Sequence, residues 1–464
     1  MIGLPPPRDD AARDALVDAL RDIVGAANVF TDPARLAPFS VDWTGRYSGV
    51  TPAVVRPGSV NEAAGVIATC LLHGAPWVPQ GGNTGLVGGG VPVDGEVVVS
   101  TSRLTGISTV DRDSLQVMVG AGTTLAELQR HVAGEGLRLG IDFGARDRAT
   151  IGAMVATNAG GNAVLRFGMM REQVTGLEAV LPDGQVVRRL SGLAKDNTGY
   201  DLTRLFCGSE GTLGLITAVR VRLVPEATHR TTAALGVASI ADALGVLAEL
   251  RSIEGLEACE LMRGVDIATL CAARGWASAP PWNAPWALLV EACGSASFEH
   301  LGAAVERSSS FLVGEVAVAD RPGVREHWWA IRDAQGDIVR AFGSVLKLDV
   351  SVPHPRLEGF VGDVTDVVAS VAPGGRLVIF GHLGDANIHV NVGAATSPFE
   401  ALEDAVLRLV LAAGGSVSAE HGIGRAKRSW LVADRGPAAV AAMRAVKTAW
   451  DPAGLANPHV LFDR

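Results

Sequence analysis

The chain has 464 residues, which at ~150 residues per domain predicts two to three domains. Its 40 Lys and Arg against 49 Asp and Glu leave a net charge of -9, which argues against a nucleic-acid-binding surface, since such surfaces need clustered basic residues. With 48% hydrophobic and 19% charged residues, the composition is that of a folded globular protein. The 56 glycines, about 12% against a usual ~7%, indicate many places where the backbone approaches another group closely.

The cysteines and the N-terminus narrow the class further. None of the five cysteines forms a Cys-x-x-Cys pair, so neither a disulfide framework nor a thiolate metal site is indicated. The first ten residues hold no apolar signal core, and no uncharged apolar run is long enough to span a bilayer as a helix. We therefore expect a reduced protein of the cytoplasm.

The first half of the chain is predicted to alternate helices and strands. Ser59 and Glu62 have the spacing of a capping box, and Gly25 suits the end of a helix. Helices are expected at 11–25, 60–72 and 124–135, and strands at 53–56, 77–79, 96–100 and within 174–225, where Pro182-Asp-Gly184 forms a turn.

A second block is predicted to begin after residues 225–228. Strands are expected at 231–235, 287–292, 314–319, 345–351 and 377–381, and helices at 240–251 and 325–342, with a mostly helical tail from Pro398. Such a pattern is typical of helices on one side of a mostly antiparallel sheet, so we expect an α+β fold.

Six glycines between residues 81 and 90 directly follow a predicted strand. The stretch lacks the Lys-Ser/Thr ending of a P-loop and does not match a Gly-x-Gly-x-x-Gly that opens a helix. Its unhindered N–H groups are suited to binding a pyrophosphate. From this cluster alone, a surface loop that needs left-handed turns explains the glycines equally well.

Two further stretches favour a cofactor site. Residues 150–162 and 208–217 combine glycines with Asn, Ser and Thr, whose small side chains let the backbone lie against a planar ring or a phosphate. Three such loops in one domain are difficult to explain as turns alone.

The landmarks Pro79-Gln-Gly-Gly-Asn-Thr-Gly85, Ala156-Thr-Asn-Ala-Gly-Gly161 and Gly208-Ser-Glu-Gly-Thr-Leu-Gly214 resemble those of the FAD-linked oxidoreductases of the vanillyl-alcohol-oxidase/PCMH type. The resemblance runs from about residue 50 to the C-terminus. It implies an N-terminal helix and a PCMH-type two-subdomain FAD-binding domain at 1–226, and a substrate (cap) domain with an antiparallel sheet at 227–415. A C-terminal helical segment at 416–464 would contribute Glu420 and His421 to the active site.

The resemblance also implies which residues contact FAD, with the pyrophosphate on the 81–85 loop. The expected set is Pro79, Gly81, Gly82, Asn83, Thr84, Gly85, Leu86, Asp142, Gly144, Gly152, Asn158, Gly161, Glu210, Ile216 and Asn457. Some relatives attach FAD covalently through a His near the first loop. Residues 81–90 contain no His, so we expect non-covalent FAD.

The strongest signal for chemistry is Gly381-His-Leu-Gly-Asp-Ala-Asn-Ile-His-Val-Asn391. If this stretch is a hairpin with Asp385-Ala386 at its tip, His382 and His389 become directly opposed, with Cβ atoms ~4.5–5.5 Å apart. Asn391 would then point to the same face as His389. Two His and a carboxylate such as Glu420 are a usual set for a divalent metal, although packed histidines are an equally good explanation from the residues alone.

This C-terminal region resembles the D-2-hydroxyglutarate and D-lactate dehydrogenase branch of the family. The resemblance implies that His382, His389 and Glu420 bind a divalent metal, usually zinc with manganese as an alternative, and that His421 is the catalytic base. Ala386 stands where a glycine is common. A metal that lowers the pKa of the substrate hydroxyl would let His421 take its proton while flavin N5 takes the hydride.

Arg332 and Lys347 are candidates for the substrate carboxylate, together with Asn391. Without the resemblance, both cations would be interpreted as solvated surface charges. Gly336 stands where the hydroxyglutarate enzymes have a hydroxyl side chain. D-2-hydroxyglutarate is therefore the first expectation, with lactate, malate or a bulkier D-2-hydroxy acid left open.

We expect a D-2-hydroxyacid dehydrogenase that passes electrons to an electron-transfer flavoprotein or a quinone, since no NAD(P) fingerprint is present, and that forms a homodimer, as is common among relatives. Two other classes stay open at this point. A flavin-free metal hydrolase would use the same His and Glu residues but leave the glycine loops without a role. A flavin-binding or storage protein would bind FAD without catalysis.

Overall fold

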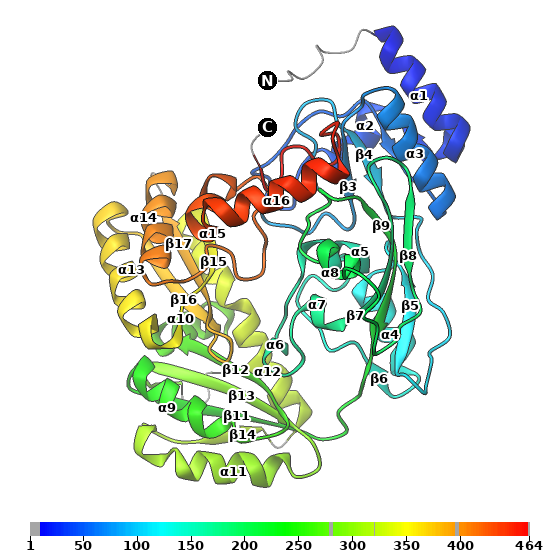
Figure 1. Ribbon diagram of the computed structural model, residues 1–464. Helices are drawn as coiled ribbons and strands as arrows, with labels where there is room; N and C mark the ends of the chain where they lie inside the picture. The colour runs from blue at the N-terminus through cyan, green and yellow to red at the C-terminus, as the bar shows by residue number, and fades with distance from the viewer. Residues whose placement is uncertain (1–9, 278–281, 320, 395–398, 463–464) are drawn as a thin grey trace. The chain divides into compact units, whose positions relative to one another are not determined.

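The computed structural model describes residues 10–277, 282–319, 321–394 and 399–462 (Figure 1). The chain forms two compact units. The first unit comprises the chain up to Gly160, Met169–Glu226 and the C-terminal segment from His421; the second comprises Gly161–Gly168 and Ala227–Glu420. Two predictions concern residues outside the described ranges: the absence of an apolar signal core near the N-terminus, which concerns residues 1–9, and the start of the helical tail at Pro398.

The first unit contains two main sheets. One has the order β1-β2-β4-β3, with β2 and β3 parallel to β4, and the other is antiparallel with the order β5-β9-β7-β8. The strands are β1 (Val29–Phe30), β2 (Val54–Val55), β3 (Trp77–Gln80), β4 (Val97–Ser100), β5 (Gln116–Gly120), β6 (Leu137–Arg138), β7 (Val174–Val180), β8 (Val186–Arg189), β9 (Leu215–Arg222) and β10 (Val224–Pro225).

The helices of the first unit follow the predicted pattern in its N-terminal half. They are α1 (Asp10–Val24), α2 (Pro33–Leu36), α3 (Val60–Leu72), α4 (Leu125–Ala133), α5 (Ile151–Thr157), α7 (Met170–Gln173), α8 (Leu202–Phe206), α15 (Leu431–Arg435) and α16 (Pro437–Trp450). Ser59 Oγ accepts a hydrogen bond from the Glu62 amide at 3.1 Å, as a capping box requires. The Glu62 carboxylate instead accepts from the Gly58 amide, so only half of the predicted box forms.

The second unit is built on a seven-stranded antiparallel sheet with the order β14-β11-β13-β12-β16-β17-β15. Its strands are β11 (Arg230–Val237), β12 (Leu256–Arg263), β13 (Trp286–Cys293), β14 (Ala317–Ala319), β15 (Ser344–Ser351), β16 (Arg376–His382) and β17 (Asn387–Ala394). Its helices are α6 (Val164–Phe167), α9 (Ile240–Leu250), α10 (Gly264–Arg274), α11 (Ser297–Arg307), α12 (Pro322–Asp333), α13 (Leu357–Val371) and α14 (Phe399–Ala412), with 3-10 turns at Ala334–Phe342. The sequence missed β12 as a strand, and it predicted one helix where α12 gives way to the 3-10 turns.

Helices cover both faces of this sheet, so the expectation of helices on one side is wrong. Along β13, Ala287 and Leu289 pack into one apolar cluster with α10 and α12. Leu288 and Val290, which point to the opposite face, are also fully buried, and α9, α11 and α13 contact strands of the same sheet. A strand that is covered on both faces has a continuous apolar run in place of an alternating pattern, and the run from Trp286 to Val290 in β13 is of this kind.

The sheets and helices confirm an α+β fold. No described helix is both long enough and apolar enough to cross a membrane.

Candidate active site

The predicted hairpin forms from β16 and β17, but its register differs from the expected one. His382 is paired with Asn387, and His389 with Phe380, so the two histidines are diagonal neighbours and not directly opposed. They still share one face, with ring centroids 5.5 Å apart. The direct pairing was wrong because the turn is centred one residue earlier than the expected Asp385-Ala386 tip.

Ala386 ends this turn in the left-handed region, with φ at 63°. A side chain there is strained because Cβ approaches the following carbonyl oxygen. This strain explains why glycine suits the position better than the Ala386 of this chain.

The structure brings three predicted metal ligands together within the second unit. One ligand atom each from His382, His389 and Glu420 lies within 4.8 Å of the other two. Burial raises the pKa of Glu420 to about 7, and the nearby Asp349 and Asp385 carboxylates add to this rise against the effect of His382. Two imidazoles and a carboxylate that is unfavourably charged without a cation fit a divalent metal.

A second carboxylate supports each histidine. His382 Nδ1 lies 2.8 Å from Glu260 Oε1, and His389 Nδ1 lies 3.4 Å from Asp349 Oδ1. Asp349 Oδ2 also accepts a hydrogen bond from the Glu420 amide at 2.7 Å. Both acids are almost fully buried. Carboxylate partners of this kind fix the orientation of metal-binding imidazoles.

These two carboxylates were not found in the sequence. Asp349 had a usable signal, because it is an acid within the predicted apolar strand 345–351, and such a residue needs a partner when buried. Glu260 had none, because β12 was not recognised as a strand.

The two imidazoles have opposite electrostatic environments. Burial would lower the pKa of His382, but the Glu260 carboxylate outweighs it and raises that pKa to about 9. Burial lowers the pKa of His389 to about 4, although Asp349 opposes the shift. His389 is therefore neutral at pH 7, with a lone pair available to a metal.

Arg332, expected to bind substrate, lies beside this cluster. Its Nε donates to Glu260 Oε2 at 2.7 Å, and its Nη2 is 3.0 Å from His382 Nε2. With 8% exposure it is not a solvated surface charge. Glu260 thus holds both a predicted metal ligand and a predicted substrate residue in place.

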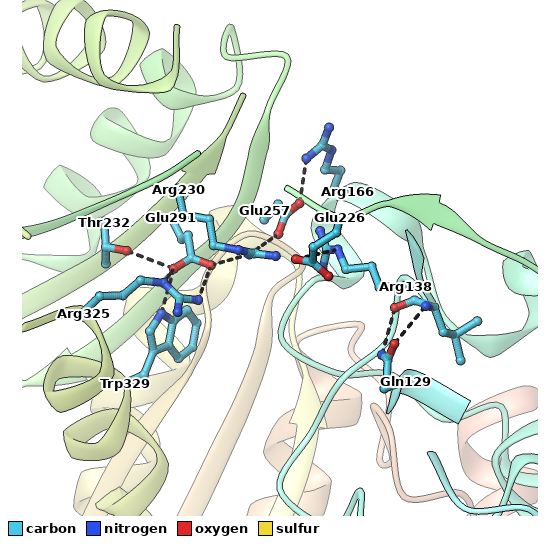
Figure 2. A network of polar contacts seen from close by, with 11 residues as sticks. Gln129, Arg138, Arg166, Glu226, Arg230, Thr232, Glu257, Glu291, Arg325 and Trp329 are labelled. Atoms are coloured by element: carbon cyan, nitrogen blue, oxygen red, sulfur yellow. Dashed lines mark hydrogen bonds and ion pairs between the residues drawn. The ribbon is translucent and has the colours of Figure 1, made fainter. Parts of the chain in front are cut away.

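The helix that carries Arg332 is fixed to the sheet at a second point. Arg325 and Trp329, on the same face of α12 as Arg332, both donate to the Glu291 carboxylate of β13. Figure 2 shows these side chains converging on Glu291 together with Thr232 and Arg230.

This second network contains another acidic cluster, formed by Glu257, Glu291 and Cys293, whose ligand atoms lie within 4.8 Å of one another. Arg166 and Arg230 bind Glu257, and Arg230 also binds Glu291 (Figure 2). Because both carboxylates are neutralised by arginines, the cluster is an ion-pair network and does not fit a cation.

Lys347 and Asn391 are direct cross-strand partners on β15 and β17. A Cβ built on Gly336 would lie 3.6 Å from Lys347 Nζ and 3.9 Å from Asn391 Nδ2. The three predicted specificity positions therefore meet at one place. Asn391 also shares the face of His389, as predicted, since the two are two residues apart on one strand.

The first unit brings the glycine loop against the start of α5. A Cβ on Gly82 would lie 1.7 Å from the Arg148 carbonyl oxygen, and one on Gly81 would lie 2.3 Å from Thr150 Oγ1. Only glycine fits at these two positions. Thr150 Oγ1 is buried without a hydrogen-bond partner among the described residues, as expected for a group that meets a ligand. Backbone pressed this closely to a buried hydroxyl fits a phosphate-binding loop.

Glu210 and Asn457, expected along the cofactor, hold protein loops together. The Glu210 carboxylate accepts hydrogen bonds from the amides of Ile423 and Gly424, both at 2.8 Å. Asn457 Nδ2 donates to the carbonyl oxygens of Gly89 and Glu210 at 3.0 and 2.7 Å. Their side chains thus join the glycine loop, the 208–214 loop and the segment that follows His421.

The other predicted FAD residues are placed as follows. Asn83 and Asn158 have left-handed backbone, and Asn158 ends α5. Gly152 lies in α5 against Ala121. The remaining members are Pro79 in β3, Thr84, Gly85 and Leu86 in the loop after it, Asp142, which pairs with Arg146, Gly144 in open space, Gly161 in the second unit and Ile216 in β9. His421 begins the last segment of the first unit, directly after Glu420.

Comparison with known proteins identifies the family. The FAD binding domain model matches residues 51–189, and the model for the C-terminal domain of FAD linked oxidases matches residues 226–461. The mitochondrial D-2-hydroxyglutarate dehydrogenase of Bos taurus is 38% identical over 94% of this chain and 81% of that protein. The D-2-hydroxyglutarate dehydrogenase of Stutzerimonas stutzeri (strain A1501) is 30% identical over 97% of this chain and 99% of that protein.

Solved structures confirm the PCMH-type fold. p-Cresol methylhydroxylase with substrate bound has a TM-score of 0.77 at 16% identity, covering 99% of each chain. An alkyldihydroxyacetonephosphate synthase has a TM-score of 0.75 at 16% identity, covering 98% of this chain and 86% of that one. The chain is an oxidoreductase that belongs to the family of FAD-linked oxidases that includes the D-2-hydroxyglutarate dehydrogenases.

Proposed function

We propose that this protein oxidises a D-2-hydroxy acid, with D-2-hydroxyglutarate first among the candidates, to the 2-oxo acid. The observation that carries the proposal is the convergence of His382, His389 and Glu420, whose ligand atoms lie within 4.8 Å of one another, on a chain with an FAD-binding domain. When bound, FAD supplies a hydride acceptor and a divalent cation, zinc or manganese, supplies stabilisation of a developing alkoxide.

The chain's own residues divide the remaining tasks. His382, His389 and Glu420 hold the cation, and Glu260 and Asp349 orient the two imidazoles. Arg332, Lys347 and Asn391 bind anionic and polar groups of the substrate. His421, next to Glu420 in sequence, accepts the hydroxyl proton.

The glycine loop of residues 81–90 binds the FAD pyrophosphate without a covalent link. We further propose an electron-transfer flavoprotein or a quinone as acceptor, a homodimer as the assembly and the cytoplasm as the location.

Anaerobic reduction of the bound flavin by a panel of D- and L-2-hydroxy acids tests the proposal. We expect bleaching of the flavin by D-acids only, loss of the reaction after removal of the metal with a chelator, and loss of turnover in His421→Ala. If no D-2-hydroxy acid reduces the bound flavin, the proposal is wrong and the protein binds flavin without this catalysis. A flavin-free hydrolase is disfavoured because both family models belong to FAD-linked proteins.

A further inference from the structure

The side-chain amide of Asn387 is buried in the candidate site and has no hydrogen-bond partner among the residues that the structure describes. It is 4% exposed, and neither Oδ1 nor Nδ2 bonds to any group in the described part of the chain. Burial of an unpaired amide is unfavourable, and most buried side-chain polar atoms in folded proteins have a partner. The strand itself does not require this residue, because an apolar side chain would fill the position without that penalty.

The position of Asn387 places its amide beside the predicted metal ligands. It is the direct cross-strand partner of His382, and on β17 it lies two residues before His389. Both relationships put the three side chains on one face of the sheet. The unpaired amide therefore faces the region that the metal and the substrate would occupy.

Three residues of β17 on this face form a row: Asn387, His389 and Asn391. At the far end of the row, Asn391 pairs with Lys347 and lies beside Gly336. At the near end, Asn387 has no charged side chain as a direct partner other than His382, since its other cross-strand neighbour is Ser351. One end of the row thus has a neutral donor beside the proposed metal ligands, and the other end has the Lys347 cation beside Gly336, which has no side chain.

We infer that Asn387 donates a hydrogen bond from Nδ2 to the C1 carboxylate of the substrate, so that the substrate lies along β17 with its head at Asn387 and its side chain toward Lys347 and Gly336. This inference rests on the proposed function. In a 2-hydroxy acid the carboxylate is attached to the carbon that carries the reacting hydroxyl, so a group that binds the carboxylate must lie next to the metal ligands. Arg332 Nε bonds to Glu260 and Arg332 Nη2 lies 3.0 Å from His382 Nε2, whereas the Asn387 side-chain amide has no hydrogen-bond partner in the described part of the chain.

The test is the affinity of the FAD- and zinc-loaded enzyme for oxalate, a small dicarboxylate that resembles the head of the substrate, measured by isothermal titration calorimetry. We expect Asn387→Leu to weaken oxalate binding at least 10-fold, and Asn387→Asp, which also adds a negative charge, to weaken it at least 100-fold. Zinc content and flavin content should equal those of the wild type. Asn28→Leu, which removes a half-buried amide of the first unit that bonds to Val24, is the matched control and should leave oxalate binding unchanged.

Unchanged oxalate affinity in a zinc-loaded Asn387→Leu would overturn the inference. So would loss of zinc from both variants, because Asn387 would then serve the metal and not the substrate. If Asn387→Leu misfolds, Asn387→Ser, which removes the amide with less change in packing, gives the same comparison. A separate measurement on the wild type distinguishes failure of the proposed function from failure of this inference. If the proposed function is wrong, no D-2-hydroxy acid reduces the wild-type flavin, whatever the oxalate titration shows.

Discussion

Glu210 and Gly424 are 214 residues apart, yet the Glu210 carboxylate accepts the Gly424 amide at 2.8 Å inside the first unit. Glu210 itself has left-handed backbone, with φ at 50°, and its own amide donates to the Ala156 carbonyl oxygen. A Cβ on Gly422 would lie 2.9 Å from the Glu210 carboxylate, so the loop after His421 must be glycine-rich to approach it. Glu210 therefore connects the FAD loops to the segment that carries the proposed catalytic base.

Replacement of Glu210 should alter stability in a pH-dependent way. Burial raises the pKa of Glu210 to about 7, against the hydrogen bonds from Ile423 and Gly424. Between pH 4.5, the ordinary pKa, and pH 7, the folded protein holds a proton that the unfolded chain releases, so this group's contribution to stability is lost as pH rises through that window. Glu210→Gln lacks this loss. Its free energy of unfolding relative to the wild type should therefore improve by about 3 kcal/mol from pH 4.5 to pH 8.

Urea unfolding of both proteins at the two pH values measures this difference. A difference between Glu210→Gln and wild type that does not change with pH would show that Glu210 does not titrate in this range. Glu210→Ala removes the carboxylate that accepts hydrogen bonds from the Ile423 and Gly424 amides, so it should lower the free energy of unfolding at every pH. This variant separates the loss of the hydrogen bonds from the effect of the charge.

Glu260→Gln should weaken metal binding without removing a ligand. The carboxylate fixes the orientation of the His382 ring, and Arg332 is bound to the same group. Loss of such a carboxylate partner typically lowers metal affinity 10–100-fold. Competition of the apoprotein with a zinc chelator measures the affinity directly, without reference to turnover.

Glu257→Gln is the matched control, because Glu257 is a buried acid of the same strand whose carboxylate pairs with Arg166 and Arg230. It should cost stability and leave zinc affinity unchanged. Equal zinc affinity of Glu260→Gln and the wild type would contradict the supporting role of Glu260.

Ala386→Gly should relieve backbone strain in the turn between β16 and β17, the strands that carry two of the proposed metal ligands. A left-handed non-glycine residue costs roughly 1–2 kcal/mol, and the greater flexibility of glycine in the unfolded chain offsets ~0.5–1 kcal/mol of the gain. We expect the free energy of unfolding to stay the same or rise by up to ~1.5 kcal/mol. Ala304→Gly, in the interior of α11, should instead lower it by ~1 kcal/mol, and a similar loss in Ala386→Gly in urea unfolding would refute the strain.

The sequence was most informative where the determinants are local. Thr124 and Glu127 form a complete capping box at the start of α4, and the hairpin between His382 and His389 follows from alternating strands around a polar turn. The register of that hairpin was beyond the sequence, because the position of the turn decides the pairing and two adjacent turn positions suit the same residues.

Glu260, unlike Asp349, could not be predicted, for a different reason. Glu260 contacts His382 and Arg332, which are 122 and 72 residues away, and the contact exists only because β12 lies next to β16 and α12 covers both. Strand order in a sheet is a property of the whole fold. The three proposed metal ligands could be singled out because two His on a predicted hairpin and a nearby carboxylate are a usual metal-binding set, and the structure brings their ligand atoms within 4.8 Å of one another.

Gly336→Thr should narrow the choice of substrate. A Cβ at this position meets Lys347 and Asn391 at ordinary contact distances and Phe380 at 3.8 Å, so a side chain fits without displacement of its neighbours. It would take space from the far end of the substrate and add a hydroxyl beside Lys347. We expect kcat/KM for branched D-2-hydroxy acids to fall at least 10-fold and kcat/KM for D-lactate to change little. We expect kcat/KM for D-2-hydroxyglutarate to rise ~10-fold, since a hydrogen bond to a charged group contributes ~1.5 kcal/mol or more.

Gly359→Thr, in α13 where a Cβ meets no atom within 4 Å, is the control and should leave the ratios of these kcat/KM values unchanged. Branched acids that retain their kcat/KM in Gly336→Thr would place the substrate side chain elsewhere than beside Lys347.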